Sequence, residues 1–234
     1  MTDGAQTPDL TLGRLGRILS EPMRLRILDE LLAGIPLPAG VLAARLGIAP
    51  STASSHLRQL TESGIVEVVV SGRSRMFTLT RADVADAVEA LLRLTAQEPG
   101  SSLRAAQRLS AMRYARSCYD HLAGVLGVTL FDVACTRGWV AHSLDGSLHI
   151  PPDGMARCSD DLRIDVALPA SRRVPVRDCF DWTERRSHLG GRLGAAILLS
   201  MIDVGWVRRR KHDRALTVTV TGRSSFERLQ TDQH

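Results

Sequence analysis

The sequence lacks features that would place it in several common protein classes. No run of about 18 apolar residues occurs in its 234 residues, so we expect no membrane-spanning helix. The first ten residues are polar and acidic, which argues against a secretory signal peptide. The four cysteines, Cys118, Cys135, Cys158 and Cys179, have no compact disulfide spacing. We therefore expect a cytoplasmic protein with reduced thiols.

Aromatic residues and lysine are also scarce. Aromatics make up 4% of the chain, so the core must consist mainly of Leu, Val, Ile and Ala. Lys211 is the only lysine among 30 basic residues. Apolar residues make up 44% and charged residues 24%, the balance of a globular protein with one or two domains.

The net charge of +5 is unevenly distributed. Residues 1–98 contain 10 Arg and 11 acidic residues, whereas residues 99–234 contain 20 Lys and Arg and 14 acidic residues. The positive excess weakly favours an anionic partner, and it lies outside the first 98 residues.

The N-terminal half has the pattern of a helix-turn-helix. Apolar spacing predicts helices over 11–19 and from Pro22 onward. A short helix over 41–46 ends at Gly47, and a second helix over 51–63 ends at Gly64. We expect a mainly α fold with small β-hairpin wings (α+β), beginning with a disordered segment over 1–10 and a winged helix-turn-helix domain over 11–97.

The helix over 51–63 has an outward face suited to the major groove of DNA, although a solvated amphipathic helix would have the same pattern. Two β-rich runs within 65–80 follow it as a hairpin, or wing, whose arginines could reach the DNA backbone. The candidate DNA-binding residues are Ser51, Thr52, Ser54, Ser55, His56, Arg58, Gln59, Arg73 and Arg75.

Residues 11–95 resemble the ArsR family of winged-helix repressors. The resemblance is carried by Glu21–Leu28, Leu42–Ile48, Ser51–Leu60, Gly64–Val66 and Gly72–Arg75. It implies a homodimer joined through the first and last helices of the domain, with the two recognition helices in successive major grooves of double-stranded operator DNA.

The common metal sites of that family are missing from this half. Family members often hold Cys-x-Cys in the helix before the recognition helix, and here Val41–Leu46 contains no sulfur. Others use Asp and His in the last helix, and here Arg81–Glu98 contains no histidine. Any sensor must therefore lie in the C-terminal half.

The C-terminal half, which follows an expected linker over 98–102, contains an internal repeat at about 118–155 and 185–223. Three pairs of segments match at an offset of 67 or 68 residues: His121–Gly127 with His188–Gly194, Gly138–Val140 with Gly205–Val207, and Ser147–Gly154 with Ala215–Gly222. We expect duplicated, degenerate winged-helix-like units within a sensor and oligomerisation domain over 103–234. The full-length pattern resembles a group of long ArsR-like regulators, and the segments Tyr114–Gly124 and Cys179–Leu189 carry this resemblance.

Sulfur and imidazole groups of the C-terminal half form a candidate metal site. Cys118 and His121 lie three residues apart, which would place them on one face of a helix, and Cys179 precedes a predicted helix that carries His188. If the repeated helices pack together, these four side chains could bind Zn(II) or another thiophilic metal, with Asp120 and Asp181 behind them. A redox-reactive thiol and a purely structural role are the alternatives.

Other functions remain open at this stage. An organic effector could lie against Trp139, Trp182 and Trp206, or the protein could bind DNA constitutively with no effector. Acid–base groups at Asp178, Asp181, Glu184 and His188 would be needed for an enzyme, but no phosphate loop, nucleophile elbow or His-Glu-x-x-His motif occurs. The basic run Arg208–Arg214 is either a solvated turn or a second phosphate-contacting wing.

Overall fold

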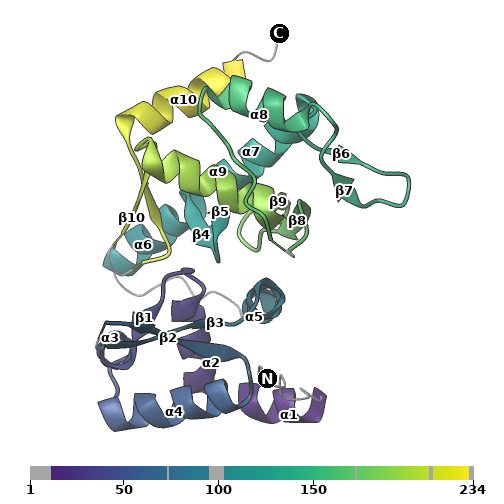
Figure 1. Ribbon diagram of the computed structural model, residues 1–234. Helices are drawn as coiled ribbons and strands as arrows, with labels where there is room; N and C mark the ends of the chain where they lie inside the picture. Colours follow the sequence, from purple (N-terminus) through teal and green to yellow (C-terminus); the bar gives the residue numbers. More distant parts are fainter. Residues whose placement is uncertain (1–11, 73, 95–102, 172, 211–212, 232–234) are drawn as a thin grey trace. The chain divides into compact units, whose positions relative to one another are not determined.

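The computed structural model describes residues 12–72, 74–94, 103–171, 173–210 and 213–231. The chain divides into two compact units, residues 1–94 and residues 95–234, which we call unit 1 and unit 2 (Figure 1). The segment expected to be disordered, 1–10, and the expected linker, 98–102, lie outside the described residues. Within the described ranges, none of the helices has the length and apolar character needed to cross a membrane.

Unit 1 is a winged helix-turn-helix. Its elements in chain order are α1 (Leu12–Leu19), α2 (Pro22–Leu31), β1 (Leu37–Pro38), α3 (Ala39–Leu46), α4 (Pro50–Glu62), β2 (Val66–Ser71), β3 (Ser74–Leu79) and α5 (Ala82–Leu94). Strands β2 and β3 form the antiparallel wing, and β1 pairs with the other edge of β3.

Local sequence explains the turn between α3 and α4. Gly47 ends α3 in the left-handed conformation, with φ of 67°, which a residue without Cβ adopts at little cost. Pro50 occupies the first turn of α4, where its missing N–H breaks no hydrogen bond. Leu42, Leu57 and Leu60 are fully buried and hold the two helices in the core.

Unit 2 begins with α6 (Leu103–Tyr114) and then repeats one order of elements twice. The first segment contains β4 (Arg116–Cys118), β5 (His121–Ala123), α7 (Val125–Thr136), β6 (Ala141–His142), β7 (Leu148–His149) and α8 (Gly154–Leu162). The second contains β8 (Arg177–Phe180), β9 (Ser187–Gly190), α9 (Gly191–Asp203), β10 (Val207–Arg209), β11 (Leu216–Val218) and α10 (Val220–Thr231).

Each segment is therefore a hairpin, a helix, a second hairpin and a second helix (Figure 1). All four hairpins are antiparallel and two-stranded. A winged-helix unit, such as unit 1, has a helix-turn-helix before its hairpin. The expected winged-helix-like units in this half are not confirmed.

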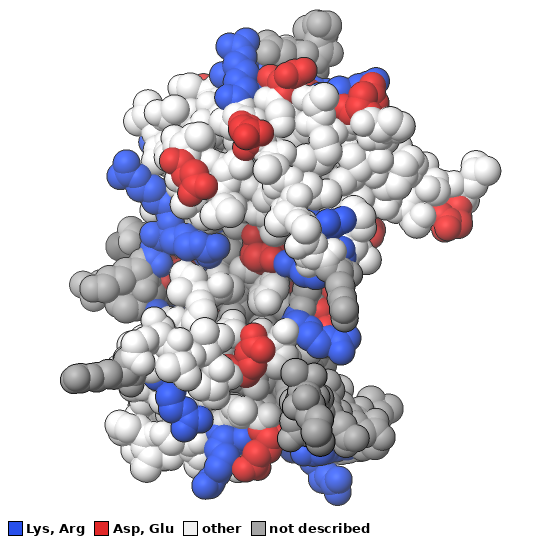
Figure 2. Space-filling model, in the orientation of Figure 1, with Lys and Arg blue, Asp and Glu red and all other residues white. Residues whose placement is uncertain are grey.

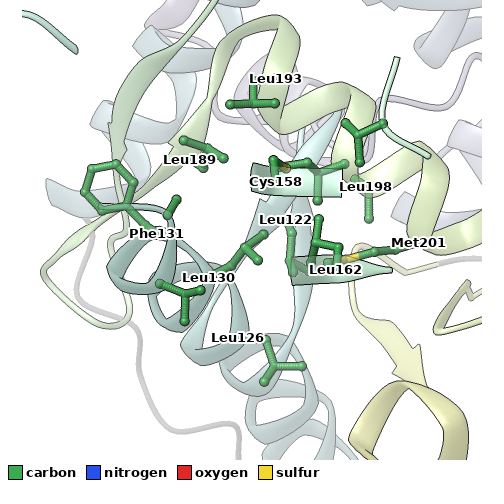
Figure 3. Packing of buried hydrophobic residues seen from close by; sticks show 14 of the residues in the cluster. Leu122, Leu126, Leu130, Phe131, Cys158, Leu162, Leu189, Leu193, Leu198 and Met201 are labelled. Atoms are coloured by element: carbon green, nitrogen blue, oxygen red, sulfur yellow. The ribbon is translucent and has the colours of Figure 1, made fainter. Parts of the chain in front are cut away.

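The core of unit 2 lies between the helices of the two segments. Leu126 and Leu130 of α7, Leu162 of α8 and Leu198 of α9 point toward one another in Figure 3, and all belong to one buried cluster. Trp139 and Trp206 also belong to this cluster, with exposed fractions of 0% and 5%, so both serve as core residues.

Candidate functional site

The outward face of α4 presents most of the predicted DNA-binding residues. Ala53, Leu57 and Leu60 point into the core, so the other side of the helix faces solvent. Of the predicted residues on that side, five are exposed, namely Ser51, Thr52, Ser54, Arg58 and Gln59, and two are partly exposed, Ser55 and His56.

A groove of about 640 Å³ lies between α4 and the wing. Ser51, Ser54 and Arg58 line one side of it, and Arg75 and Phe77 of β3 line the other. Arg73, at the predicted wing tip, lies outside the described residues. The groove brings an arginine from the helix and an arginine from the wing to one concave surface.

Gln59 has a partner that the sequence did not suggest. The guanidinium of Arg24, near the start of α2, donates to the Gln59 side-chain oxygen, and its Nη2 donates to the Arg17 carbonyl oxygen at 3.2 Å. In this conformation the Gln59 amide retains its NH₂ donor for another partner, while Arg24 adds a cation beside the recognition helix.

The four predicted metal ligands of unit 2 converge. The Sγ atoms of Cys118 and Cys179 and one nitrogen each of His121 and His188 all lie within 4.8 Å of one another, and all four residues are buried. We call this group the Cys2His2 cluster. Each segment of unit 2 supplies one cysteine and one histidine.

The expected secondary structure around these ligands was wrong. Cys118 and His121 are not on one helix; they face each other across the two-residue turn of the β4–β5 hairpin. Cys179 and His188 likewise form a directly opposed pair in the β8–β9 hairpin, so His188 lies on a strand. Cross-strand neighbours have close Cβ atoms, which brings each cysteine to its histidine whatever the length of the intervening loop.

The distances within the Cys2His2 cluster match tetrahedral coordination. The two sulfurs are 3.9 Å apart, and the Nε2 atoms of His121 and His188 are 3.1 Å apart. Metal–sulfur bonds of about 2.3 Å and metal–nitrogen bonds of about 2.0–2.1 Å, in a tetrahedron, give about 3.8 Å between sulfurs and about 3.3 Å between nitrogens. The sulfur–sulfur and nitrogen–nitrogen spacings therefore fit a tetrahedral metal ion such as Zn(II).

A carboxylate oxygen lies beside the other ring nitrogen of each histidine. His121 Nδ1 is 3.3 Å from Asp120 Oδ1, and His188 Nδ1 is 3.3 Å from Asp181 Oδ2. This leaves both Nε2 atoms directed at the centre of the cluster. Carboxylate–histidine pairs of this kind fix the ring and its tautomer at metal sites in proteins.

Asp181 is also the centre of a buried hydrogen-bond network. Arg116 Nη2 donates to its Oδ1 at 3.0 Å, with both side chains fully buried, and the Gly124 N–H donates to its Oδ2 at 2.6 Å. Thr183 donates to Oδ1 through its N–H and its hydroxyl. Burial by itself raises the pKa of Asp181, but these bonds and His188 hold that pKa well below its usual range.

Asp120 and His121 shift each other's pKa in opposite directions. Burial alone would lower the pKa of His121, but the Cys118 thiolate and Asp120 raise it to about 9. Burial alone would raise the pKa of Asp120, but His121 and Arg173 lower it to about 2. Arg173 forms an ion pair with Asp120 and lies 5.8 Å from the centre of the Tyr119 ring.

The remaining cysteines lie outside the Cys2His2 cluster. Cys158 is fully buried in the core beside Leu162, and burial raises the pKa of its thiol to about 12. Cys135, on α7, is half-buried.

Two repeated glycines allow the segments to approach at the cluster. A Cβ on Gly127 would lie 3.5 Å from His188 Cβ, and one on Gly194 would lie 3.1 Å from His121 Cβ. Each glycine therefore packs against the histidine of the other segment. The repeated His-to-Gly spacing was the sequence signal for this arrangement, whereas nothing in the sequence pointed to Arg116 or Arg173.

Comparisons with known proteins agree on the class of this chain. Residues 19–69 match a family model described as a helix-turn-helix domain. YdfF of Bacillus subtilis, described as an uncharacterized HTH-type transcriptional regulator, is 33% identical over 217 residues, covering 93% of this chain and 96% of YdfF. CmtR of Mycobacterium tuberculosis, an HTH-type transcriptional regulator, is 39% identical over 99 residues, covering 41% of this chain and 83% of CmtR.

Among solved structures, the M. tuberculosis cadmium metal-sensor CmtR is 36% identical, with a TM-score of 0.32, covering 40% of this chain and all of that one. A homodimeric winged helix-turn-helix domain from Mycobacterium bovis, a possible ArsR-family regulator, is 32% identical, with a TM-score of 0.33, covering 36% of this chain and 75% of that one. The full-length relative is described as a transcriptional regulator, which favours a regulator over the enzyme alternative. The chain belongs to the ArsR family of helix-turn-helix transcriptional regulators, and it binds DNA through its N-terminal helix-turn-helix.

Proposed function

We propose that this protein is a homodimeric repressor whose affinity for its operator changes when the Cys2His2 cluster of unit 2 binds a thiophilic metal. The observation that carries the proposal is the convergence of four buried ligand atoms, two sulfurs and two nitrogens, within 4.8 Å. Two thiolates neutralise a divalent cation, so Zn(II) or Cd(II) leaves no net charge in the buried site.

On this proposal, Cys118, His121, Cys179 and His188 hold the metal, and Asp120 and Asp181 orient the histidines. A bound metal would supply a link between the two segments of unit 2. A metal changes DNA affinity only if it favours one conformation of the dimer over the other, and such couplings typically amount to about 5–150-fold.

Cobalt(II) titration followed by DNA-binding measurements tests the proposal. We expect thiolate-to-Co(II) charge-transfer absorption at one metal per chain, its displacement by Zn(II), and a change of at least fivefold in fluorescence anisotropy Kd on promoter DNA between Zn(II) and chelator. The Cys118→Ser/Cys179→Ser protein should lose both responses, and Cys135→Ser should keep them. Metal binding without any change in Kd would overturn the regulatory role but leave a structural metal.

The residues proposed to contact DNA divide into two kinds. We expect Arg58, on the exposed face of α4, to contact base edges, and Arg75, which lines the groove from the wing, to contact the backbone. We expect Arg58→Ala to cost about 1–3 kcal/mol on operator DNA and to relax specificity, and Arg75→Ala to weaken binding to all sequences alike. Competition with scrambled DNA measures the difference, and unchanged specificity in Arg58→Ala would count against base contact.

A redox response is the second candidate function. The 3.9 Å between the Cys118 and Cys179 sulfurs is a short movement from the disulfide length of about 2.05 Å. A peroxide could oxidise the pair, with two electrons and two protons passing from the thiols to form water and one S–S bond. Peroxide-treated protein that changes DNA affinity without metal, and reverses with dithiothreitol, would favour this function over metal sensing.

A further inference from the structure

The β10–β11 hairpin of unit 2 presents arginines on an outward strand. Arg208 and Arg209 of β10 and the following Arg210 are all exposed, while Val207 and Leu216 anchor the hairpin in the core. Basic side chains gather on the side of unit 2 where β10 and β11 lie (Figure 2).

The equivalent hairpin of the first segment shows that the fold does not need these cations. At the repeat offset of 67 residues, Arg208, Arg209 and Arg210 correspond to Ala141, His142 and Ser143. Strands β6 and β7 contain no arginine or lysine, yet they pair in the same antiparallel way. A hairpin at this place in the fold therefore forms without arginines, so the arginines of β10 can serve a contact.

Carboxylates of unit 2 do not neutralise Arg208 and Arg210. Within the described residues, Arg208 has no ion pair, and Arg210 Nε donates to the Thr217 hydroxyl at 3.2 Å. Asp213, the acid nearest to Arg210 in the chain, is paired with Arg108 at 3.3 Å and accepts from the Ala215 N–H at 3.2 Å. Burial lowers the pKa of Arg209 and the charge of Asp120 raises it, but Asp120 itself is paired with Arg173.

We propose that the β10–β11 hairpin is a second DNA-contacting element that binds the phosphate backbone through Arg208 and Arg210. Unit 1 is a DNA-binding winged helix-turn-helix, so DNA is the polyanion that the exposed arginines of unit 2 are expected to meet. Residues 1–98 carry 10 Arg against 11 acidic residues, and the positive excess lies in the rest of the chain. Guanidinium groups on a strand can pair bidentately with phosphate oxygens.

The salt dependence of DNA binding tests this inference with the full chain. Each phosphate contact contributes about 0.9 to the slope of log Kd against log salt, so two contacts per hairpin contribute about 1.8. We expect Arg208→Gln/Arg210→Gln to reduce the slope by about that amount per bound chain. Between 200 mM and 50 mM KCl the variant should then gain about tenfold less affinity than the wild type for each bound chain, or roughly 150-fold less for a dimer that uses both hairpins.

The loss should be equal on promoter and scrambled duplexes, because phosphate contacts carry no sequence information. The control is Arg157→Gln/Arg163→Gln, which removes two exposed arginines from the region of α8 and should leave the slope unchanged. Circular dichroism and thermal denaturation check that the hairpin variant is folded. A wild-type slope in that variant overturns the inference.

The inference goes beyond the proposed function and does not depend on the metal response. If the protein binds DNA but its affinity does not change with metal, metal sensing is refuted and the second DNA contact is not. If the hairpin variant keeps the wild-type salt dependence of Kd, the second DNA contact is refuted and metal sensing is not. Wild-type protein that binds no duplex even at 50 mM KCl overturns both.

Discussion

Replacing Asp181 by Asn should destabilise unit 2 more than any conservative surface change. Asn is nearly the same size as Asp but has one oxygen in place of two. If that oxygen keeps the Oδ1 bonds to Thr183 and Arg116, the amide NH₂ points at the Gly124 N–H and at His188. Two donors then face each other, and the fully buried Arg116 has no counter-charge.

Breaking a buried ion pair by removing one partner costs about 3–5 kcal/mol. We expect a loss of that size in the free energy of unfolding of Asp181→Asn, measured by urea denaturation in the presence of chelator. Asp153→Asn is the matched control, because Asp153 and its partner Arg157 are 56% and 51% exposed, and exposed pairs contribute about 0–1 kcal/mol.

A double-mutant cycle separates the ion pair from the rest of the network. Arg116→Met removes the cation, so Asp181→Asn should cost less in that background than in the wild type. An Asp181→Asn protein within 1 kcal/mol of the wild type, or single effects that simply add, would refute the assignment of Asp181 as the centre of the network.

Two further predictions concern packing and thiol chemistry. A Cβ on Gly194 would lie 2.2 Å from the Leu189 carbonyl oxygen, so Gly194→Ala should lose at least about 1–3 kcal/mol of stability and bind Co(II) more weakly. Gly40→Ala, with open space around the added Cβ, should leave the stability unchanged or raise it. Equal free energies of unfolding for Gly194→Ala and Gly40→Ala in urea denaturation would contradict the close contact between Gly194 and Leu189. Because burial raises the pKa of Cys158 to about 12, iodoacetamide should alkylate it far more slowly than the half-buried Cys135. Peptide mass spectrometry measures the two rates, and rapid labelling of Cys158 in folded protein would argue against its burial.

Local signals predicted unit 1 closely. The helix expected over 51–63 is α4, Pro50–Glu62, and the wing expected within 65–80 is formed by β2 and β3. Gly47 ends the preceding helix in the left-handed conformation, as its sequence position suggested. Caps, glycine stops and apolar spacing act over a few residues, so the sequence alone contains them.

The hairpins that hold the four proposed metal ligands could not be predicted in the same way. A spacing of three residues suits one helical turn and also the ends of a two-residue hairpin turn. Tyr119 takes a φ of 59° in that turn, a conformation usually marked by Gly or Asn, so the usual signal is missing. The turn is held by Arg173, which pairs with Asp120 and lies over the Tyr119 ring. That partner is over 50 residues away in the chain.

The loop between β8 and β9 presents the same difficulty. Its two ligands, Cys179 and His188, are nine residues apart, which is no recognisable metal-ligand spacing. The carboxylate of Asp181 organises the loop by accepting the N–H groups of Thr183 and Glu184, and strand register then sets Cys179 opposite His188. The ligand pair therefore depends on backbone pairing rather than on sequence separation.

The four side chains proposed to bind metal converge, although only the two histidines occupy matching positions in the internal repeat, and their geometry constrains how they would work. Each segment supplies one sulfur and one nitrogen, so neither segment alone has more than half of a tetrahedral set. A metal would therefore gain its full binding energy only when the two segments meet. It would then stabilise unit 2 by an amount that grows with the logarithm of metal concentration over Kd. The glycines that pack each helix against the opposite histidine lie at the same junction. A metal bound there would act on the packing between the segments, which makes that packing the element of unit 2 best placed to transmit the signal.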